Sequence, residues 1–223
     1  MTGLIIKDIK LLSKQKKLAI LYAATAIMLS FAMDETFITS YFSLVGSLLV
    51  LTTLSYDSYD NGYPFLMSLP INGKTYVYAK YVFSFMGLAL FWIASILLQF
   101  PVMLIRGKEI IVSDVFFSNL AITPLFLIAI AIMIPISLKF GPDKSRIVMI
   151  IICFGGMGIG IAGKAVTDFL IREFSINIDI SGFIAMLQSI PQNLLVLILL
   201  AIGIAIMLIS AFISVGIMNN KEF

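Results

Sequence analysis

A glycine-rich run, FGGMGIGIAGKAV at residues 154–166, is the part of the chain whose residue types and spacing come nearest to a site for chemistry. It contains the dinucleotide-binding spacing G-x-G-x-x-G and nearly a phosphate-binding loop, G-x-x-x-x-G-K, at Gly158, Gly160, Gly163 and Lys164. Both patterns require a strand before the glycines and a helix after them, and the second also requires a hydroxyl where Ala165 stands. Because the glycines follow the residues MIIICF within an apolar segment, we expect no nucleotide to bind there. The G-x-x-x-G spacing of Gly156 and Gly160 instead predicts close packing of two membrane helices.

Most other catalytic chemistry lacks the residues that it needs. The sequence contains no histidine, which excludes Ser-His-Asp catalysis and histidine proton relays and removes most zinc and haem sites. Cys153 is the only cysteine, and its apolar surroundings are typical of a small core residue. The apolar segments hold no paired carboxylates, so an intramembrane protease is not expected. We predict no catalytic centre and no metal site in this chain.

Polar side chains within apolar segments usually mark function in membrane proteins. Gln99, followed by Pro101, is the main one and is our candidate for lining a transport pathway. No charged residue lies at mid-depth in a predicted span, which argues against proton or ion coupling. Energy for transport should therefore come from elsewhere. Asp57 and Asp60 lie at the membrane edge, and we interpret them as a solvated turn.

A second group of candidate residues lies in the loop at 57–80. Two Asn-Gly pairs are turn signals, while Pro64 can open a helix and Pro70 can end one. The pattern predicts a short apolar helix, Phe65–Leu69, presented between two turns. Its exposed side chains would fit a groove on a partner protein, and the alternative is an interfacial helix lying on lipid. The apolar side chains concerned are Phe65, Leu66, Met67 and Leu69.

The elements that must position these residues are membrane helices. Of the 223 residues, 61% are hydrophobic and 12% charged, with a mean hydropathy of +1.09. Soluble domains carry about 25% charged residues, so the composition requires a lipid environment. A bilayer core of about 30 Å needs about 20 apolar residues in a helix. We predict an all-α polytopic membrane protein with one transmembrane domain, 18–223, and six spans at about 18–33, 36–56, 81–105, 115–138, 147–163 and 194–217.

The distribution of basic residues predicts the orientation. With the N-terminus inside, 11 of the 15 basic residues fall in inner segments and only 4 in outer ones. The four outer residues are Arg106, Lys108, Lys164 and Arg172. We therefore expect both termini in the cytoplasm.

Two further segments outside the spans are predicted to be helical. Residues 1–17 place lysines on one helical stripe and Ile5, Ile9 and Leu12 on another, which is typical of a basic amphipathic helix at the membrane surface. The alternative is a solvated flank that only sets topology. The outer segment 164–193 predicts short helices dipping into the outer leaflet, and the alternative is an amphipathic surface loop.

The loop at 57–80 also carries a family resemblance. Its sequence, D-x-x-x-x-G-Y-x-F-L-x-S-L-P-I-x-x-K from Asp57 to Lys74, is similar to that of ABC-2 type transporter permeases. The basic entry helix, the six predicted spans and the long outer segment before the last span agree with that family. The small permeases of bacterial peptide exporters, including the exporter of staphylococcal phenol-soluble modulins, are the most similar. Many relatives have Arg where this chain has Asn72, Gly73 and Lys74.

The resemblance implies that the short helix is a coupling helix docked on a separate ATPase, which would hold ATP and magnesium. The implied coupling residues are Tyr63, Phe65, Leu66, Leu69, Pro70, Ile71 and Lys74. It also implies a second permease copy, identical or closely related, in a bacterial plasma membrane. The predicted function is export of amphipathic or hydrophobic peptides, with no nucleic-acid partner. Two alternatives are efflux of an antibiotic or lipid, and a non-transporting scaffold for a soluble partner.

Overall fold

The computed structural model describes residues 1–14, 16–30, 33, 35–58, 62–141, 144, 147, 151 and 189–221. All regular elements in these residues are α-helices, as predicted. In chain order they are α1 (Thr2–Ser13), α2 (Lys16–Ser30), α3 (Glu35–Ser58), α4 (Gly62–Ser68), α5 (Gly73–Ile105), α6 (Val112–Phe140) and α9 (Gln192–Asn219).

Four of these helices, α3, α5, α6 and α9, are long and apolar enough to cross a membrane. They coincide with the second, third, fourth and sixth predicted spans. α2 overlaps the first predicted span, 18–33, but has only 15 residues. A helix of that length is about 22 Å long, which is shorter than a hydrocarbon core of about 30 Å. The packing glycines Gly156 and Gly160 lie outside the described residues, as does nearly all of the fifth predicted span, 147–163, and of the outer segment 164–193.

α5 begins earlier than the sequence pattern indicated. Its first residue is Gly73, after an extended Asn72, so residues 73–80 belong to the helix and not to the loop. The reason is burial: Tyr76, Val77 and Ala79 are almost completely covered by neighbouring helices. A helix that buries three side chains in its first two turns gains enough apolar contact to extend beyond the hydrophobic span.

Close contacts set the directions of the main helices. α6 and α9 run parallel, because Gly203 lies against Pro124, Ser210 Oγ donates to the Ala131 carbonyl and Lys221 Nζ donates to the Leu138 carbonyl. α3 and α5 run antiparallel: a Cβ at Gly46 would lie 2.7 Å from Phe91, and one at Gly87 would lie 3.0 Å from Val50. These glycines permit the close approach that membrane helices need in the absence of a hydrophobic drive.

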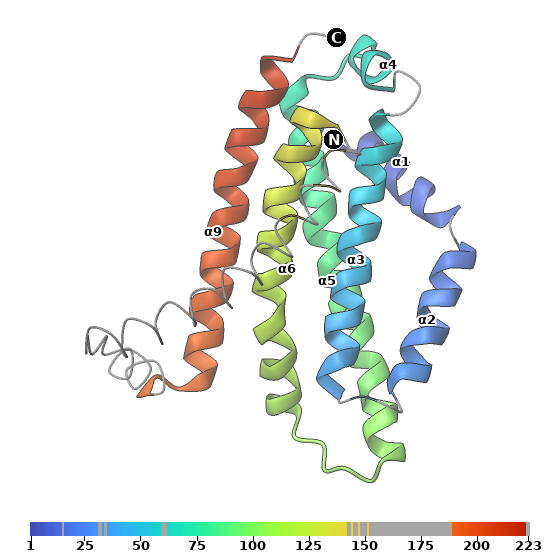
Figure 1. Ribbon diagram of the computed structural model, residues 1–223, viewed down its shortest axis with the longest axis vertical. Helices are drawn as coiled ribbons and strands as arrows, with labels where there is room; N and C mark the ends of the chain where they lie inside the picture. Colours follow the sequence, from blue (N-terminus) through green and yellow to red (C-terminus); the bar gives the residue numbers. More distant parts are fainter. Residues whose placement is uncertain are drawn as a thin grey trace, which may run out of the picture.

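The short helix α4 lies across one end of this bundle (Figure 1). That end, here called the α4 end, contains the C-terminal ends of α3, α6 and α9 and the N-terminal end of α5. The main buried apolar cluster extends to it and includes Leu4, Tyr63, Leu66, Tyr76 and Met218. The opposite end holds the beginnings of α3 and α6 and the end of α5, where Arg106 Nη2 donates to the carbonyls of Ser30 and Met33 and so fastens α2.

α1 packs on the bundle through Leu4 and Asp8, and its predicted position at the membrane surface stays a prediction. Leu4 and Asp8 are buried, while Ile9, which the pattern assigned to the apolar stripe, is half exposed beside Ile6. The Asp8 carboxylate is paired with a buried lysine of α5. Ile6 and Ile9 lie on the exposed side of α1.

Candidate functional site at the α4 end

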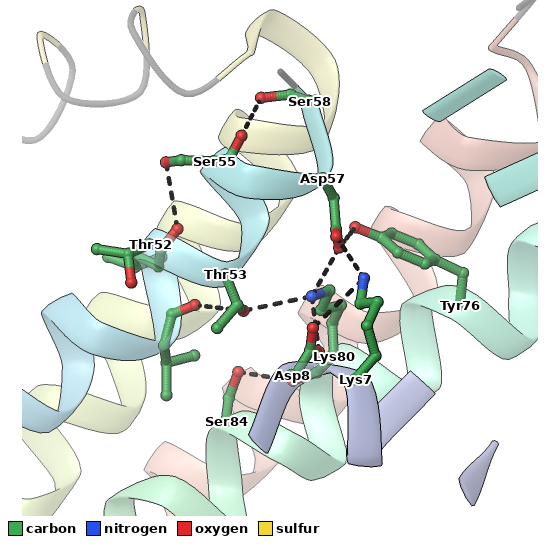
Figure 2. Close-up of polar contacts among 12 residues, drawn as sticks. Lys7, Asp8, Thr52, Thr53, Ser55, Asp57, Ser58, Tyr76, Lys80 and Ser84 are labelled. Carbon is green, nitrogen blue, oxygen red and sulfur yellow. Dashed lines mark hydrogen bonds and ion pairs between the residues drawn. The ribbon is translucent and has the colours of Figure 1, made fainter. Parts of the chain in front are cut away.

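Four charged side chains from three helices meet at the α4 end of the bundle, and Figure 2 shows their contacts. We call Lys7 and Asp8 of α1, Asp57 of α3 and Lys80 of α5 the charge cluster. Lys80 Nζ lies 2.7 Å from Asp8 Oδ2 and 2.7 Å from Asp57 Oδ2. Lys7 Nζ pairs with Asp57 Oδ1 and lies 3.4 Å from Asp8 Oδ1. Two positive and two negative groups therefore balance.

Neutral side chains complete the charge cluster. Tyr76 donates its hydroxyl to Asp57 Oδ2 at 2.8 Å, and Lys80 Nζ also donates to Thr53 Oγ1 at 3.3 Å. Lys80, Asp8 and Asp57 are only 2%, 1% and 5% exposed. Burying charges is expensive unless each is paired and hydrogen-bonded, and here the pairing comes from helices that are distant in sequence.

The interpretation of Asp57 as part of a solvated turn is therefore wrong. Its carboxylate is buried because two lysines and a tyrosine, from α1 and α5, supply partners that water would otherwise provide. Asp60 lies outside the described residues. Sequence reasoning also missed Asp8 and Lys80 as site residues, and their only signal was an acid within a basic helix and a lysine at the edge of an apolar span.

The charge cluster holds both ends of the α4 segment. Asp57 is in the last turn of α3, directly before that segment, while Tyr76 and Lys80 are in the first turns of α5, directly after it. The contacts of Asp57 with Tyr76 and Lys80 hold the end of α3 against the beginning of α5, and Lys7 and Asp8 attach α1 to the same cluster. The charge cluster therefore fixes the two helices that flank α4.

α4 itself has one attached face and one free face. Tyr63 and Leu66 are buried, and the Tyr63 ring packs edge-on against Tyr76 with centroids 5.9 Å apart. Burial raises the pKa of Tyr63 to about 12. A Cβ on Gly62 would lie 2.5 Å from the Asp57 carbonyl oxygen, so only glycine fits there. The expected exposure of Leu66 is wrong, because this side chain fills the apolar cluster below α4.

The outward face of α4 and the turn after it carry the remaining predicted residues. Phe65 is 67% exposed and Leu69 is 40% exposed. Pro70 and Lys74 are also exposed, whereas Ile71 is partly packed against the apolar cluster. The side chain of Met67 lies outside the described residues. The structure therefore leaves Phe65 and Leu69 exposed on α4 and the turn after it, and Lys74 exposed in the first turn of α5.

The pathway candidate Gln99 lies towards the opposite end, in a second polar group. Its Nε2 donates to Asn119 Oδ1 at 3.0 Å and to Thr39 Oγ1 at 3.2 Å, and its Oε1 accepts from Asn119 Nδ2 at 2.6 Å. We call Thr39, Gln99 and Asn119 the amide cluster; it joins α3, α5 and α6. A role for Gln99 in a pathway stays a prediction. Asn119 and Thr39 were missed, although each is a polar residue in an apolar helix.

In a comparison with known proteins, a family model described as ABC-2 family transporter protein matches residues 3–219, nearly the whole chain. No curated protein and no solved structure matches it.

Proposed function

The chain belongs to the ABC-2 family of transporter proteins, and we propose that it is the membrane subunit of an ATP-driven exporter of amphipathic or hydrophobic peptides. It is a permease component with several membrane helices and without catalytic activity of its own, and the ATPase is a separate protein. In this proposal ATP and magnesium are held by that partner.

The observation that carries the proposal is the two-faced arrangement of α4. Tyr63 and Leu66 attach one face to the bundle, while Phe65 and Leu69 are exposed. A groove in a partner protein can bind this exposed pair of apolar side chains. Because α4 is already attached to the bundle, docking would cost little conformational entropy. We assign the ATPase as that partner.

The proposed topology has six crossings with the α4 end in the cytoplasm. α6 and α9 are parallel neighbours, and two parallel spans joined in one chain need a crossing between them, which supports the fifth span. Most lysines of the described residues gather at the α4 end, as in cytoplasmic segments. The opposite end has Arg106 and Lys108. This orientation brings α4 to the compartment that contains ATP.

The proposed cargo rests on the family resemblance and on the apolar interior of the spans. Efflux of an antibiotic or a lipid is the alternative within the same family. We also propose that a second copy of the permease, or a close relative, completes the pathway in a bacterial plasma membrane. A scaffold that anchors a partner without transport would not need α4 to be attached to the helices that cross the membrane.

Capture of the ATPase by the solubilised permease tests the proposal. The variant Phe65→Ala/Leu69→Ala should insert normally, since neither side chain supports the fold. Each lost contact is worth about 1.5–3 kcal/mol, so capture of an ABC ATPase that purifies with the wild-type chain should weaken tenfold or more at about 1.4 kcal/mol per decade. ATP-dependent export should fall with it.

Phe140→Ala is the matched control, because Phe140 is a half-exposed phenylalanine at the same end of the bundle, on α6. This variant should capture the ATPase like the wild type. Unchanged capture and unchanged export by the double variant would mean that α4 lies on lipid, and the proposed function would lose its structural support.

A further inference from the structure

The end of α9 forms a second attachment for α4. Lys221 follows α9 and extends its Nζ between two other elements. Nζ donates a hydrogen bond to the Leu138 carbonyl at 2.9 Å and lies 4.5 Å from the centre of the Tyr63 ring. One ammonium group therefore joins α9, the last turn of α6 and the attached face of α4.

Each of these contacts has a physical reason. The last carbonyls of a helix lack partners within the helix and carry the negative end of its dipole, so a lysine there is favourable. A cation over the face of a tyrosine ring is attracted by the ring's quadrupole. Partial burial lowers the pKa of Lys221, because it removes part of the water around the ammonium group.

Apolar packing beside Lys221 makes the attachment close. Met218 of α9 is buried in the same cluster as Tyr63 and Leu66. A Cβ on Gly73, the first residue of α5, would lie 3.0 Å from Met218 Cγ. The end of α9 therefore fits tightly beneath the turn that follows α4.

The two attachments of α4 reach different helices. The charge cluster connects its base to α1, α3 and α5, whereas Lys221 and Met218 connect it to α6 and α9. Resting on the proposed function, we infer that Lys221 is a positioning residue through which displacement of α4 by the ATPase reaches α6 and α9. Docking of the ATPase uses the opposite face of α4 and does not require this lysine.

The inference is tested by the ratio of export to ATP hydrolysis in reconstituted vesicles. The permease is assembled with its ATPase, and the cargo probe is a fluorescent amphipathic helical peptide. Lys221→Met keeps the length of the side chain but removes the charge. Its ATPase capture should match the wild type, while peptide exported per ATP should fall about fivefold, equivalent to about 1 kcal/mol at about 1.4 kcal/mol per decade.

Two further variants test whether the contacts of the ammonium group are responsible. Lys221→Arg should keep coupling near the wild-type level, because a guanidinium group can donate to the Leu138 carbonyl and stack on the Tyr63 ring. Lys139→Met is the matched control: Lys139 is an exposed lysine at the end of α6 whose ammonium lies over its neighbour Phe140. It should couple normally.

The partner side of the contact gives a second, independent measurement, which applies also if Lys221→Met inserts poorly. Tyr63→Leu should uncouple export in the same way, and Tyr63→Phe, which keeps the ring face, should not. The double variant Lys221→Met/Tyr63→Leu should be no worse than either single change. Normal coupling in Lys221→Met or Tyr63→Leu, or no rescue by arginine, would overturn the inference. Loss of capture in the Phe65→Ala/Leu69→Ala variant is separate and concerns only the proposed function.

Discussion

The charge cluster and the amide cluster solve the same packing problem at opposite ends of the bundle in different ways. Both bury polar side chains where three helices meet. The amide cluster uses only neutral groups, and Gln99 and Asn119 satisfy each other reciprocally. The charge cluster uses four ions and reaches beyond the membrane helices to α1. At the α4 end, removal of one charged side chain therefore leaves an opposite charge buried without its ion-pair partner.

This difference has an energetic consequence. Removing one member of a buried ion pair leaves an uncompensated charge and typically destabilises by about 3–5 kcal/mol. Hydrogen bonds between polar side chains in membrane proteins average about 0.6 kcal/mol, up to about 1.7. We expect the charge cluster to control the position of α1 and α4 strongly, and the amide cluster to add only modest stability.

The largest effect is expected for Lys80→Met. Within the charge cluster it leaves the two carboxylates of Asp8 and Asp57 to share one cation, the partly exposed Lys7. The midpoint for unfolding in detergent should therefore fall by an amount corresponding to about 3–5 kcal/mol. Adding Asp8→Leu to this variant removes one of the two orphaned carboxylates and should recover a substantial part of the loss. If the double variant is less stable than Lys80→Met alone, the pairing does not govern this region.

A smaller effect is expected for Asn119→Leu. The substitution removes the hydrogen-bonding partner of Gln99 and Thr39 within the amide cluster. Stability should fall by about 1–2 kcal/mol, and ATPase capture should stay at the wild-type level because α4 is distant. Destabilisation as large as that of Lys80→Met would remove the distinction between the two clusters.

The smallest effect is expected for Lys74→Ala at the α4 end. Lys74 is exposed on the first turn of α5, and an exposed charge pair contributes about 0–1 kcal/mol. ATPase capture should weaken less than about fivefold and should depend on salt. A loss equal to that of Phe65→Ala/Leu69→Ala would show that charge, and not the apolar pair, makes the docking contact.

Local patterns in the sequence predicted much of the fold but little of the charge cluster. Apolar runs indicated the four long helices, and the turn residues around Pro64 and Pro70 indicated a short helix where α4 lies. Asp8 and Lys80 are 72 residues apart, and nothing local shows that they meet. The same limitation applies to Leu66, whose burial depends on an apolar cluster formed by residues from several helices.

The predicted glycine packing contact stays a prediction. The G-x-x-x-G rule pointed to Gly156 and Gly160, which lie outside the described residues. The close contacts in the described residues include those at Gly46, Gly87 and Gly203, and none of these three glycines has a second glycine four residues away. Their partners Phe91, Val50 and Pro124 come from other helices, so a one-dimensional motif could not reveal them.

Site-specific photo-crosslinking tests most directly the claim that the α4 end engages the ATPase. Photoreactive benzoylphenylalanine is placed at Phe65 on α4 or at Leu104 near the opposite end of α5, two positions with exposures of 67% and 68%. After illumination of assembled transporter in membranes, we predict a permease–ATPase adduct from position 65 and none from position 104. An adduct from position 104, with none from position 65, would contradict the account.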